Sequence, residues 1–169
     1  RWAKKNNKAR VFGHRNGVKS VREVTEGAAE CGVKYLTLYA FSTENWNRPK
    51  TEVNALMQLL VTTIGKETKT LQKNNIRLLA IGELDNLPGN CNRELQKAID
   101  ETASNSGMSL ILALSYSSKW EILNAVKALL NDVKAQKISD LEITEEVFNS
   151  YLCTAGIPDP ELLIRTSGE

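Results

Sequence analysis

Strand-like and helix-like stretches alternate along this chain of 169 residues. Residues 35–41, YLTLYAF, are strand formers that are apolar on both faces, which is typical of an inner strand covered by helices on each side. Short apolar runs predict further strands at 76–81, 108–114 and 162–164. Apolar residues at helical spacing predict helices within 16–30, 53–71, 95–102, 118–130 and 144–152. This order predicts an α/β fold with a mostly parallel central sheet flanked by helices.

Local signals mark the beginnings of two of these helices. Ser118 is followed three residues later by Glu121, which is the spacing of a capping box. Thr144 stands just before the apolar positions of the helix within 144–152. We therefore expect Ser118 and Thr144 to cap the two helices that follow them.

A polar loop, residues 42–48, follows the predicted strand at 35–41, and Pro49 closes it before a long helix. In open α/β sheets, ligands bind outside the carboxyl ends of the strands, so this loop is a candidate site. Polar residues there could equally form an ordinary solvated connection. Trp46 favours a site, because a large aromatic residue is an unusual choice for a purely solvated loop.

Charge is distributed unevenly, although the net charge is only +2. The first 22 residues contain eight basic residues and no acidic one, whereas the other 147 contain 14 basic and 20 acidic residues. The basic segment leads into a predicted helix whose N-terminus, with Arg10, His14 and Arg15 nearby, suits an anion. Its partner could be phosphate groups, nucleic acid or a membrane surface.

Several classes of site are excluded by motif. The chain has neither a GxGxxG nor a GxxxxGK[ST] sequence, and its single histidine rules out a zinc site with several histidines. Three widely spaced cysteines indicate reduced thiols rather than a disulfide framework. What remains is the basic leader, the loop, and Arg165 after the last predicted strand. Arginines converging from separate segments are suited to binding a diphosphate.

Four segments resemble the bacterial cis-prenyltransferases, the family of undecaprenyl diphosphate synthase: RWAKK, FGHRNGVKSVRE, LTLYAFSTENWNRPKTEV and DPELLIRTSGE. The resemblance implies a homodimeric enzyme with a hydrophobic tunnel that uses Mg²⁺ and has no nucleic-acid partner. It would add isopentenyl diphosphate units to farnesyl diphosphate, giving a long undecaprenyl-type diphosphate, the carrier lipid for cell-wall synthesis. It implies a cytoplasmic protein, peripheral to the inner face of the membrane, to which the product is delivered.

The resemblance also assigns roles to individual residues. It implies that Arg1, Arg10 and His14 bind the allylic diphosphate, with Trp2 shaping that pocket, and that Arg165 holds isopentenyl diphosphate. It places Ala40 and Phe41 at the mouth of the tunnel. Ser42, Asn45, Trp46, Arg48 and Glu52 match a mobile loop that positions isopentenyl diphosphate, and Asn45, Arg48 and His14 are the residues expected to act in catalysis. Reasonable tunnel walls are Leu56, Leu60 and the strand at 108–114.

The chain departs from the family pattern at three places. The metal-binding signature expected before Arg1 and the segment expected after Glu169 lie outside it, so we expect no metal ligand within residues 1–169. We therefore interpret 1–169 as a single domain, incomplete at both ends, and expect it to be inactive by itself. Residues 115–119, SYSSK, stand where many members have NYGGR. Two alternatives stay open: a noncatalytic partner subunit, and a nucleic-acid-binding module that uses the basic leader.

Overall fold

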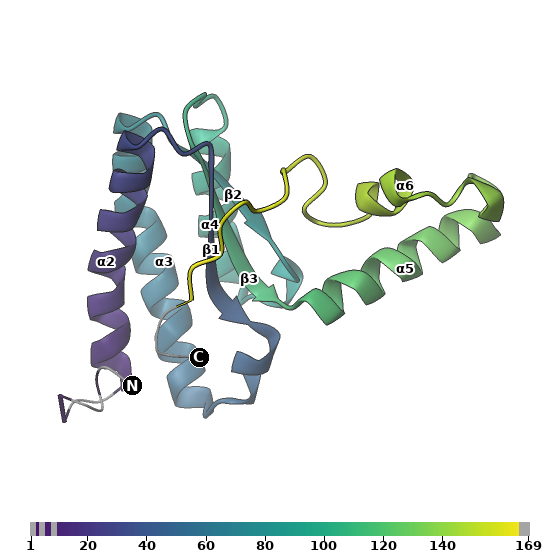
Figure 1. Ribbon diagram of the computed structural model, residues 1–169. Helices are drawn as coiled ribbons and strands as arrows, with labels where there is room; N and C mark the ends of the chain where they lie inside the picture. Colours follow the sequence, from purple (N-terminus) through teal and green to yellow (C-terminus); the bar gives the residue numbers. More distant parts are fainter. Residues whose placement is uncertain (1–2, 4–5, 8–9, 166–169) are drawn as a thin grey trace. The chain divides into compact units, whose positions relative to one another are not determined.

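The computed structural model describes residues 3, 6–7 and 10–165. The chain divides into two compact units, Arg1–Ser115 and Tyr116–Glu169, each of which is described by itself. The first unit contains the sheet with helices α2 (Arg10–Glu30), α3 (Lys50–Lys73) and α4 (Gly89–Thr102). The second contains helices α5 (Ser118–Lys134) and α6 (Glu145–Ser150) (Figure 1).

The sheet has three strands in the order β1-β3-β2. They are β1 (Tyr35–Ser42), β2 (Arg77–Ile81) and β3 (Ser109–Tyr116). β2 and β3 are parallel, with Leu78 opposite Leu110 and Ile81 opposite Ala113. The Ser109 amide donates to the Lys34 carbonyl at 2.8 Å, so β1 and β3 begin side by side and run in the same direction. This parallel sheet with flanking helices confirms the α/β fold that the sequence predicts.

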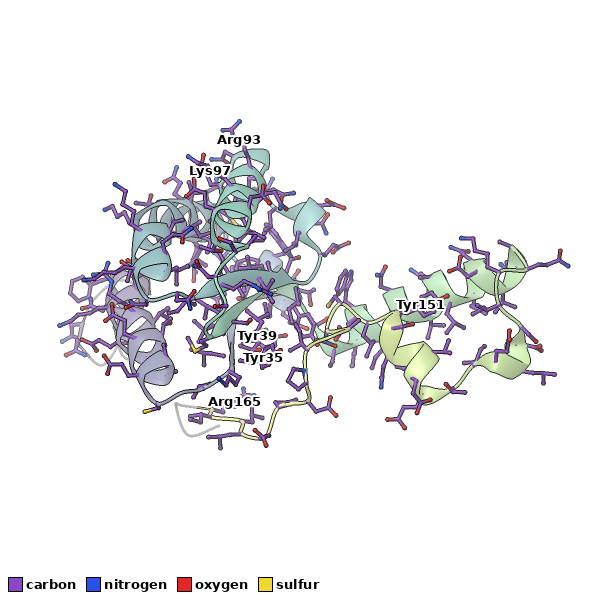
Figure 2. The ribbon with its side chains drawn as sticks, turned by 90° about the horizontal axis from the view of Figure 1, so that it is seen from above. Tyr35, Tyr39, Arg93, Lys97, Tyr151 and Arg165 are labelled. Carbon is purple, nitrogen blue, oxygen red and sulfur yellow. The ribbon has the colours of Figure 1, made fainter. Side chains whose placement is uncertain are left out.

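The inner strand of this sheet is β3, and the prediction that 35–41 is an inner strand is wrong for the part of the chain that the structure describes. All side chains from Ser109 to Ser115 are buried. β1 is at the edge, and Tyr35 and Tyr39 project from it with 43% and 59% of their surface exposed (Figure 2). The apolar run did not distinguish an inner strand from an edge strand, because tyrosine fits an apolar strand and also tolerates water at its hydroxyl end.

One hydrophobic core joins the helices of the first unit to the sheet. Buried positions of α3 and α4 pack with Leu78 of β2 and with alternate residues of β3: Val53, Met57, Ile64, Leu71, Cys91, Leu95, Ala98, Leu110, Leu112 and Leu114. Apolar residues on this face of α3 recur every three or four positions, which is why the sequence pattern predicts this helix well. Cys91 is fully buried there, and burial raises the pKa of its thiol.

Helix α5 begins one residue earlier than its sequence pattern suggests. Its N-cap is Ser117, whose hydroxyl accepts from the Trp120 amide, and Ser118 is the first helical residue. The predicted capping box between Ser118 and Glu121 is therefore wrong. The Glu121 carboxylate is instead buried and accepts hydrogen bonds from the Tyr116 hydroxyl and the Cys153 thiol. The Thr144 cap is confirmed, since its hydroxyl accepts from the Val147 amide at 3.3 Å.

The predicted strand at 162–164 is not formed. These residues have no regular secondary structure, and Leu162, Leu163 and Ile164 are 76%, 87% and 76% exposed. A strand exists only where its backbone groups find a partner strand, and the sheet that the structure describes ends at β1 and β2. An apolar run can suggest a strand without supplying that partner.

Candidate active site

The loop between β1 and α3 has a defined shape. Residues Thr43–Asn47 form a short 3-10 helix, η1. The Ser42 amide donates to the Asn45 side-chain oxygen at 3.2 Å, and the Arg48 amide donates to the Asn45 carbonyl at 3.2 Å. Asn45 thus orders both ends of the loop through its side chain and its backbone. The carboxamide nitrogen of Asn45 is the part of the side chain that these two bonds leave uncommitted.

Trp46 anchors this loop to the sheet. Its ring meets Phe41 edge to face, with 4.9 Å between the ring centroids and 71° between the planes. Its indole nitrogen donates to the Ser115 hydroxyl at 2.9 Å, at the end of β3. Phe41 and Ser115 are both buried. The alternative interpretation of residues 42–48, an ordinary solvated connection, therefore does not fit Trp46, which is partly buried and contacts two strands.

Ser115 has a left-handed backbone conformation with a φ of 49°. Residues that carry a side chain rarely adopt this backbone conformation, and asparagine and glycine tolerate it best. This agrees with the resemblance noted in the sequence, where many members of the family have asparagine at this position. Here the serine hydroxyl gives the strained residue a compensating partner, because it accepts the hydrogen bond from Trp46.

Arg48 and Glu52 form an ion pair at the start of α3. The guanidinium and carboxylate are 3.0 Å apart, and their side chains are 35% and 12% exposed. Glu52 lies in the first turn of α3, where a negative charge interacts favourably with the helix N-terminus. The pair fixes the Arg48 side chain through one of its nitrogens and leaves other guanidinium donors for an anionic ligand.

A cavity of about 450 Å³ lies between α2, α3 and the sheet. Tyr39, Ala40 and Phe41 line the end of it that lies at the polar loop, and Asn74 and Ile76 line the other end. Its walls are mainly apolar and include the predicted tunnel residues Leu56, Leu60, Leu110, Leu112 and Leu114. This volume is in the range of protein ligand sites, and the lining suits an apolar chain.

Two groups at the cavity have altered acidities. Partial burial raises the pKa of the Tyr39 phenol, and the charge of Glu44 raises it further. Arg22 and Glu67 both line the cavity and are joined by hydrogen bonds, which raise the pKa of Arg22 above its already high value. Neither change alters the charge of these groups near neutral pH. The walls of the cavity are mainly apolar, and its charged lining residues are the Arg22–Glu67 pair and Glu26.

The predicted site residues divide into those that the structure brings together and those that it does not test. Contacts between neighbouring members bring six of them together, and only the first of these lines the cavity: Phe41, Ser42, Asn45, Trp46, Arg48 and Glu52. Arg1 and Trp2 lie outside the described residues. The backbone of Arg10 and His14 lies in the first turns of α2, where Gly13 and Gly17 line the cavity. Arg165 belongs to the second unit.

No group of three or more histidine, cysteine, aspartate or glutamate side chains able to hold a metal occurs among residues 3, 6–7 and 10–165. Within the same residues, none of the helices combines the length and the apolar character required to cross a bilayer.

The whole chain, residues 1–169, matches the family model described as "Putative undecaprenyl diphosphate synthase". The chain belongs to the undecaprenyl diphosphate synthase family. It is 51% identical to an isoprenyl transferase of Porphyromonas gingivalis and 48% identical to one of Clostridium perfringens, over all 169 residues in both comparisons. It spans 66% and 67% of the lengths of these two curated relatives.

Two solved structures share the fold of the chain. Lavandulyl diphosphate synthase from Lavandula x intermedia, in complex with dimethylallyl diphosphate, matches 90% of the chain with a TM-score of 0.87 and 30% identity. A probable undecaprenyl diphosphate synthase from Campylobacter jejuni matches 80% of the chain with a TM-score of 0.69 and 33% identity. The chain covers 66% and 62% of those two structures. The predicted family and fold class are therefore confirmed.

Three residues at the loop and the cavity could not be identified from the sequence: Ser115, Arg22 and Glu67. Ser115 receives the Trp46 hydrogen bond from 69 positions away, and Arg22 meets Glu67 across 45 positions. No local pattern signals such pairs. Arg22 and Glu67 look like ordinary surface charges on two amphipathic helices until the cavity between them is known.

Proposed function

We propose that the protein is a cis-prenyltransferase that adds isopentenyl diphosphate units to farnesyl diphosphate and forms an undecaprenyl-type polyprenyl diphosphate, the carrier lipid for cell-wall synthesis. The observation that carries this proposal is the apolar cavity of about 450 Å³ that begins at the ordered polar loop. A reaction that lengthens a hydrocarbon chain on a diphosphate needs these two features side by side. Family membership and the names of the two isoprenyl transferases support the same activity.

The chemistry requires stabilisation of charge at one end of the substrate. The bond between the first carbon of the primer and its diphosphate breaks, and the diphosphate keeps the electron pair. The double bond of isopentenyl diphosphate then supplies the electrons for the new carbon–carbon bond. A proton leaves the neighbouring carbon for a phosphate oxygen, with the Asn45 carboxamide positioned to assist. Water must be excluded from the carbocation, which is the role we assign to the loop.

In this proposal, separate sets of residues bind the two diphosphates. The N-terminal end of α2, with Arg1, Trp2, Arg10 and His14, binds the primer, because a helix N-terminus and arginine donors stabilise phosphate charge. Arg48, held by Glu52, uses its remaining donors for isopentenyl diphosphate, together with Ser42. Arg165 keeps the role in binding isopentenyl diphosphate that the resemblance to the family implies. Phe41 and Trp46 form the boundary between the polar site and the cavity.

Incorporation of radiolabelled isopentenyl diphosphate tests the activity. The protein, expressed at its natural length, is incubated with farnesyl diphosphate and Mg²⁺, and long-chain product is expected. Absence of product, with a stably folded protein, would favour a noncatalytic partner subunit. Salt-sensitive binding of RNA or DNA instead of diphosphates would favour the nucleic-acid module.

Substitutions separate the two substrate sites. Trp46→Ala and Arg48→Ala should impair use of isopentenyl diphosphate more than binding of the primer, whereas Arg10→Ala should weaken primer binding by about 1.5–3 kcal/mol, the contribution of a charged hydrogen bond. Lys97→Ala on α4, which is exposed and lies outside the cavity lining, is the control. Equal effects on both substrates would contradict the division of the site.

Four finer features belong to the same proposal. Mg²⁺ dependence is tested by EDTA, homodimer formation by sedimentation, and a peripheral location at the inner face of the cytoplasmic membrane by fractionation. The fourth is that residues 1–169 alone are inactive. Exchanging them for the matching segment of the Clostridium perfringens relative tests it, because product from the exchanged protein and none from the 169-residue span is the expected result.

A further inference from the structure

The Arg22–Glu67 ion pair lies where α2 and α3 face each other across the cavity. Arg22 Nε donates to Glu67 Oε2 at 2.9 Å, and the Arg22 terminal nitrogen Nη2 donates to Glu67 Oε1, so the pair is bidentate. Arg22 is 49% exposed at its side chain, whereas Glu67 is 18% exposed. Both residues line the cavity. A two-bond contact between a planar guanidinium and a carboxylate fixes the spacing of the two helices more firmly than one bond.

At this pair, the part of the cavity lining that α2 and α3 contribute changes from mainly apolar to mostly polar. From the mouth, Gly13 and Met57 precede Arg22 and Glu67 by nine and ten residues, which corresponds to about 14–15 Å along the helices. The helix residues on this stretch are mainly apolar. Beyond the pair they are mostly polar: Thr25, Glu26, Thr70 and Asn74.

An apolar chain that grows from the mouth therefore meets this pair after it has passed the apolar stretch. Further growth along the helices would bring hydrocarbon against a charged pair and separate it from water, which is unfavourable. Parting α2 from α3 would require both hydrogen bonds to break. Arg22 also experiences the charge of Glu26, so loss of the arginine would leave two carboxylates at the same place.

We propose that the Arg22–Glu67 ion pair is a clasp between α2 and α3 that limits the length of the prenyl chain the cavity accepts. This inference rests on the proposed function and adds a specificity determinant to it. The two residues act on the product's tail and have no role in the condensation at the mouth. Breaking the clasp shifts the products to longer chains.

Charge reversal and charge exchange test the clasp. Arg22→Glu and Glu67→Arg each break the pair, and the double variant Arg22→Glu/Glu67→Arg restores it in the opposite sense. The product distribution is measured by chromatography of the dephosphorylated products of the protein expressed at its natural length. Each single variant is expected to lengthen the main product by at least one isoprene unit, and the double variant to return it to the original length.

Lys19→Glu is the matched control. Lys19 pairs with Glu23 on the same helix, but their side chains are 83% and 63% exposed and neither lines the cavity. This charge reversal should leave product length unchanged. Unchanged or shorter products from the single variants would overturn the proposal, and so would a double variant that stays like the single ones. If a charge reversal prevents folding, Glu67→Gln replaces it, with the same expected direction.

A second measurement needs no catalysis. Uptake of the apolar fluorophore N-phenyl-1-naphthylamine is followed by stopped-flow fluorescence with the same variants. We expect several-fold faster uptake when the pair is broken and recovery in the double variant. If the protein forms no product at all, the proposed function fails. The uptake experiment still shows whether the Arg22–Glu67 pair holds α2 and α3 together. Equal uptake rates in all variants would show that the Arg22–Glu67 pair does not hold α2 and α3 together, even if the enzyme were active.

Discussion

At the residue scale, Trp46 connects the polar loop to the sheet by two different interactions. Its ring packs edge to face on Phe41, and its indole nitrogen bonds to the buried Ser115 hydroxyl. The left-handed backbone of Ser115 is unfavourable for serine, so the hydrogen bond holds a residue that is already strained. The position of the loop thus depends on a residue at the end of another strand.

Replacing Trp46 with phenylalanine should separate these interactions. Trp46→Phe keeps an aromatic ring near Phe41 but removes the donor, leaving the buried Ser115 hydroxyl without its partner, and is expected to lower the free energy of unfolding by about 1–3 kcal/mol. Urea denaturation measures this change. Combining Trp46→Phe with Ser115→Ala forms a double-mutant cycle, whose coupling energy isolates the hydrogen bond. A coupling energy of zero would show that the bond contributes nothing.

The residue scale also shows where sequence reasoning ends. The composition of residues 42–48 and the presence of Trp46 were sufficient to identify the loop as a site candidate. The partners of Trp46 and Arg22 could not be predicted, because each lies on an element distant in sequence and the pairing depends on strand order and helix position. Arg48 and Glu52, four residues apart, form the kind of pair that spacing alone can predict.

At the element scale, the correct cap of α5 can be tested against the predicted one. Ser117→Ala removes the hydroxyl that accepts from the Trp120 amide and is expected to lower the free energy of unfolding by about 1 kcal/mol. Ser118→Ala is the matched control, since Ser118 is exposed and already helical, so its effect should be within about 0.5 kcal/mol. Thermal or urea unfolding compares the two, and a larger effect for Ser118→Ala would restore the original capping box.

Element prediction succeeded where periodicity decides and failed where partners decide. The long helix α3 follows from its apolar stripe, and β3 from an apolar run that is buried throughout. Residues 35–41 and 162–164 have equally apolar runs, but β1 is an edge strand and 162–164 form no strand. A strand's neighbours are set by the whole sheet, so its own sequence cannot specify whether it is central, at an edge or unpaired.

At the scale of the whole molecule, the stripe of α3 combines two roles that the sequence could not separate. Val53, Met57, Ile64 and Leu71 belong to the buried core, and all of them except Val53 also line the cavity, together with the partly buried Leu56 and Leu60. The cavity exists because α2 does not pack against α3 and the sheet along its whole length. Glycines on α2 contribute to this gap, since they present no side chain to it.

Filling this gap gives the most direct test of the cavity as the chamber for the growing chain. Gly17 lines the cavity in the middle of α2, and a Cβ atom built there meets no atom within 4 Å. The backbone at Gly17 therefore accepts a Cβ without a clash, and Gly17→Phe directs an aromatic ring toward the cavity. We expect the product distribution to move to shorter chains, because the ring occupies space that the prenyl chain would otherwise fill. The first condensation should continue, since Gly17 is not among the predicted phosphate-binding residues.

The matched control is Gly27→Phe, on the same helix. Gly27 also has no atom within 4 Å of a built Cβ, but it does not line the cavity, so the same substitution should leave product length unchanged. Both substitutions remove a helical glycine and should gain part of the roughly 0.5–1 kcal/mol by which glycine disfavours a helix. Only Gly17→Phe can add the burial of a ring, worth up to about 1.5–3 kcal/mol. Shorter products together with a larger free energy of unfolding for Gly17→Phe alone would identify the cavity as the chamber, whereas identical products from both variants would exclude it.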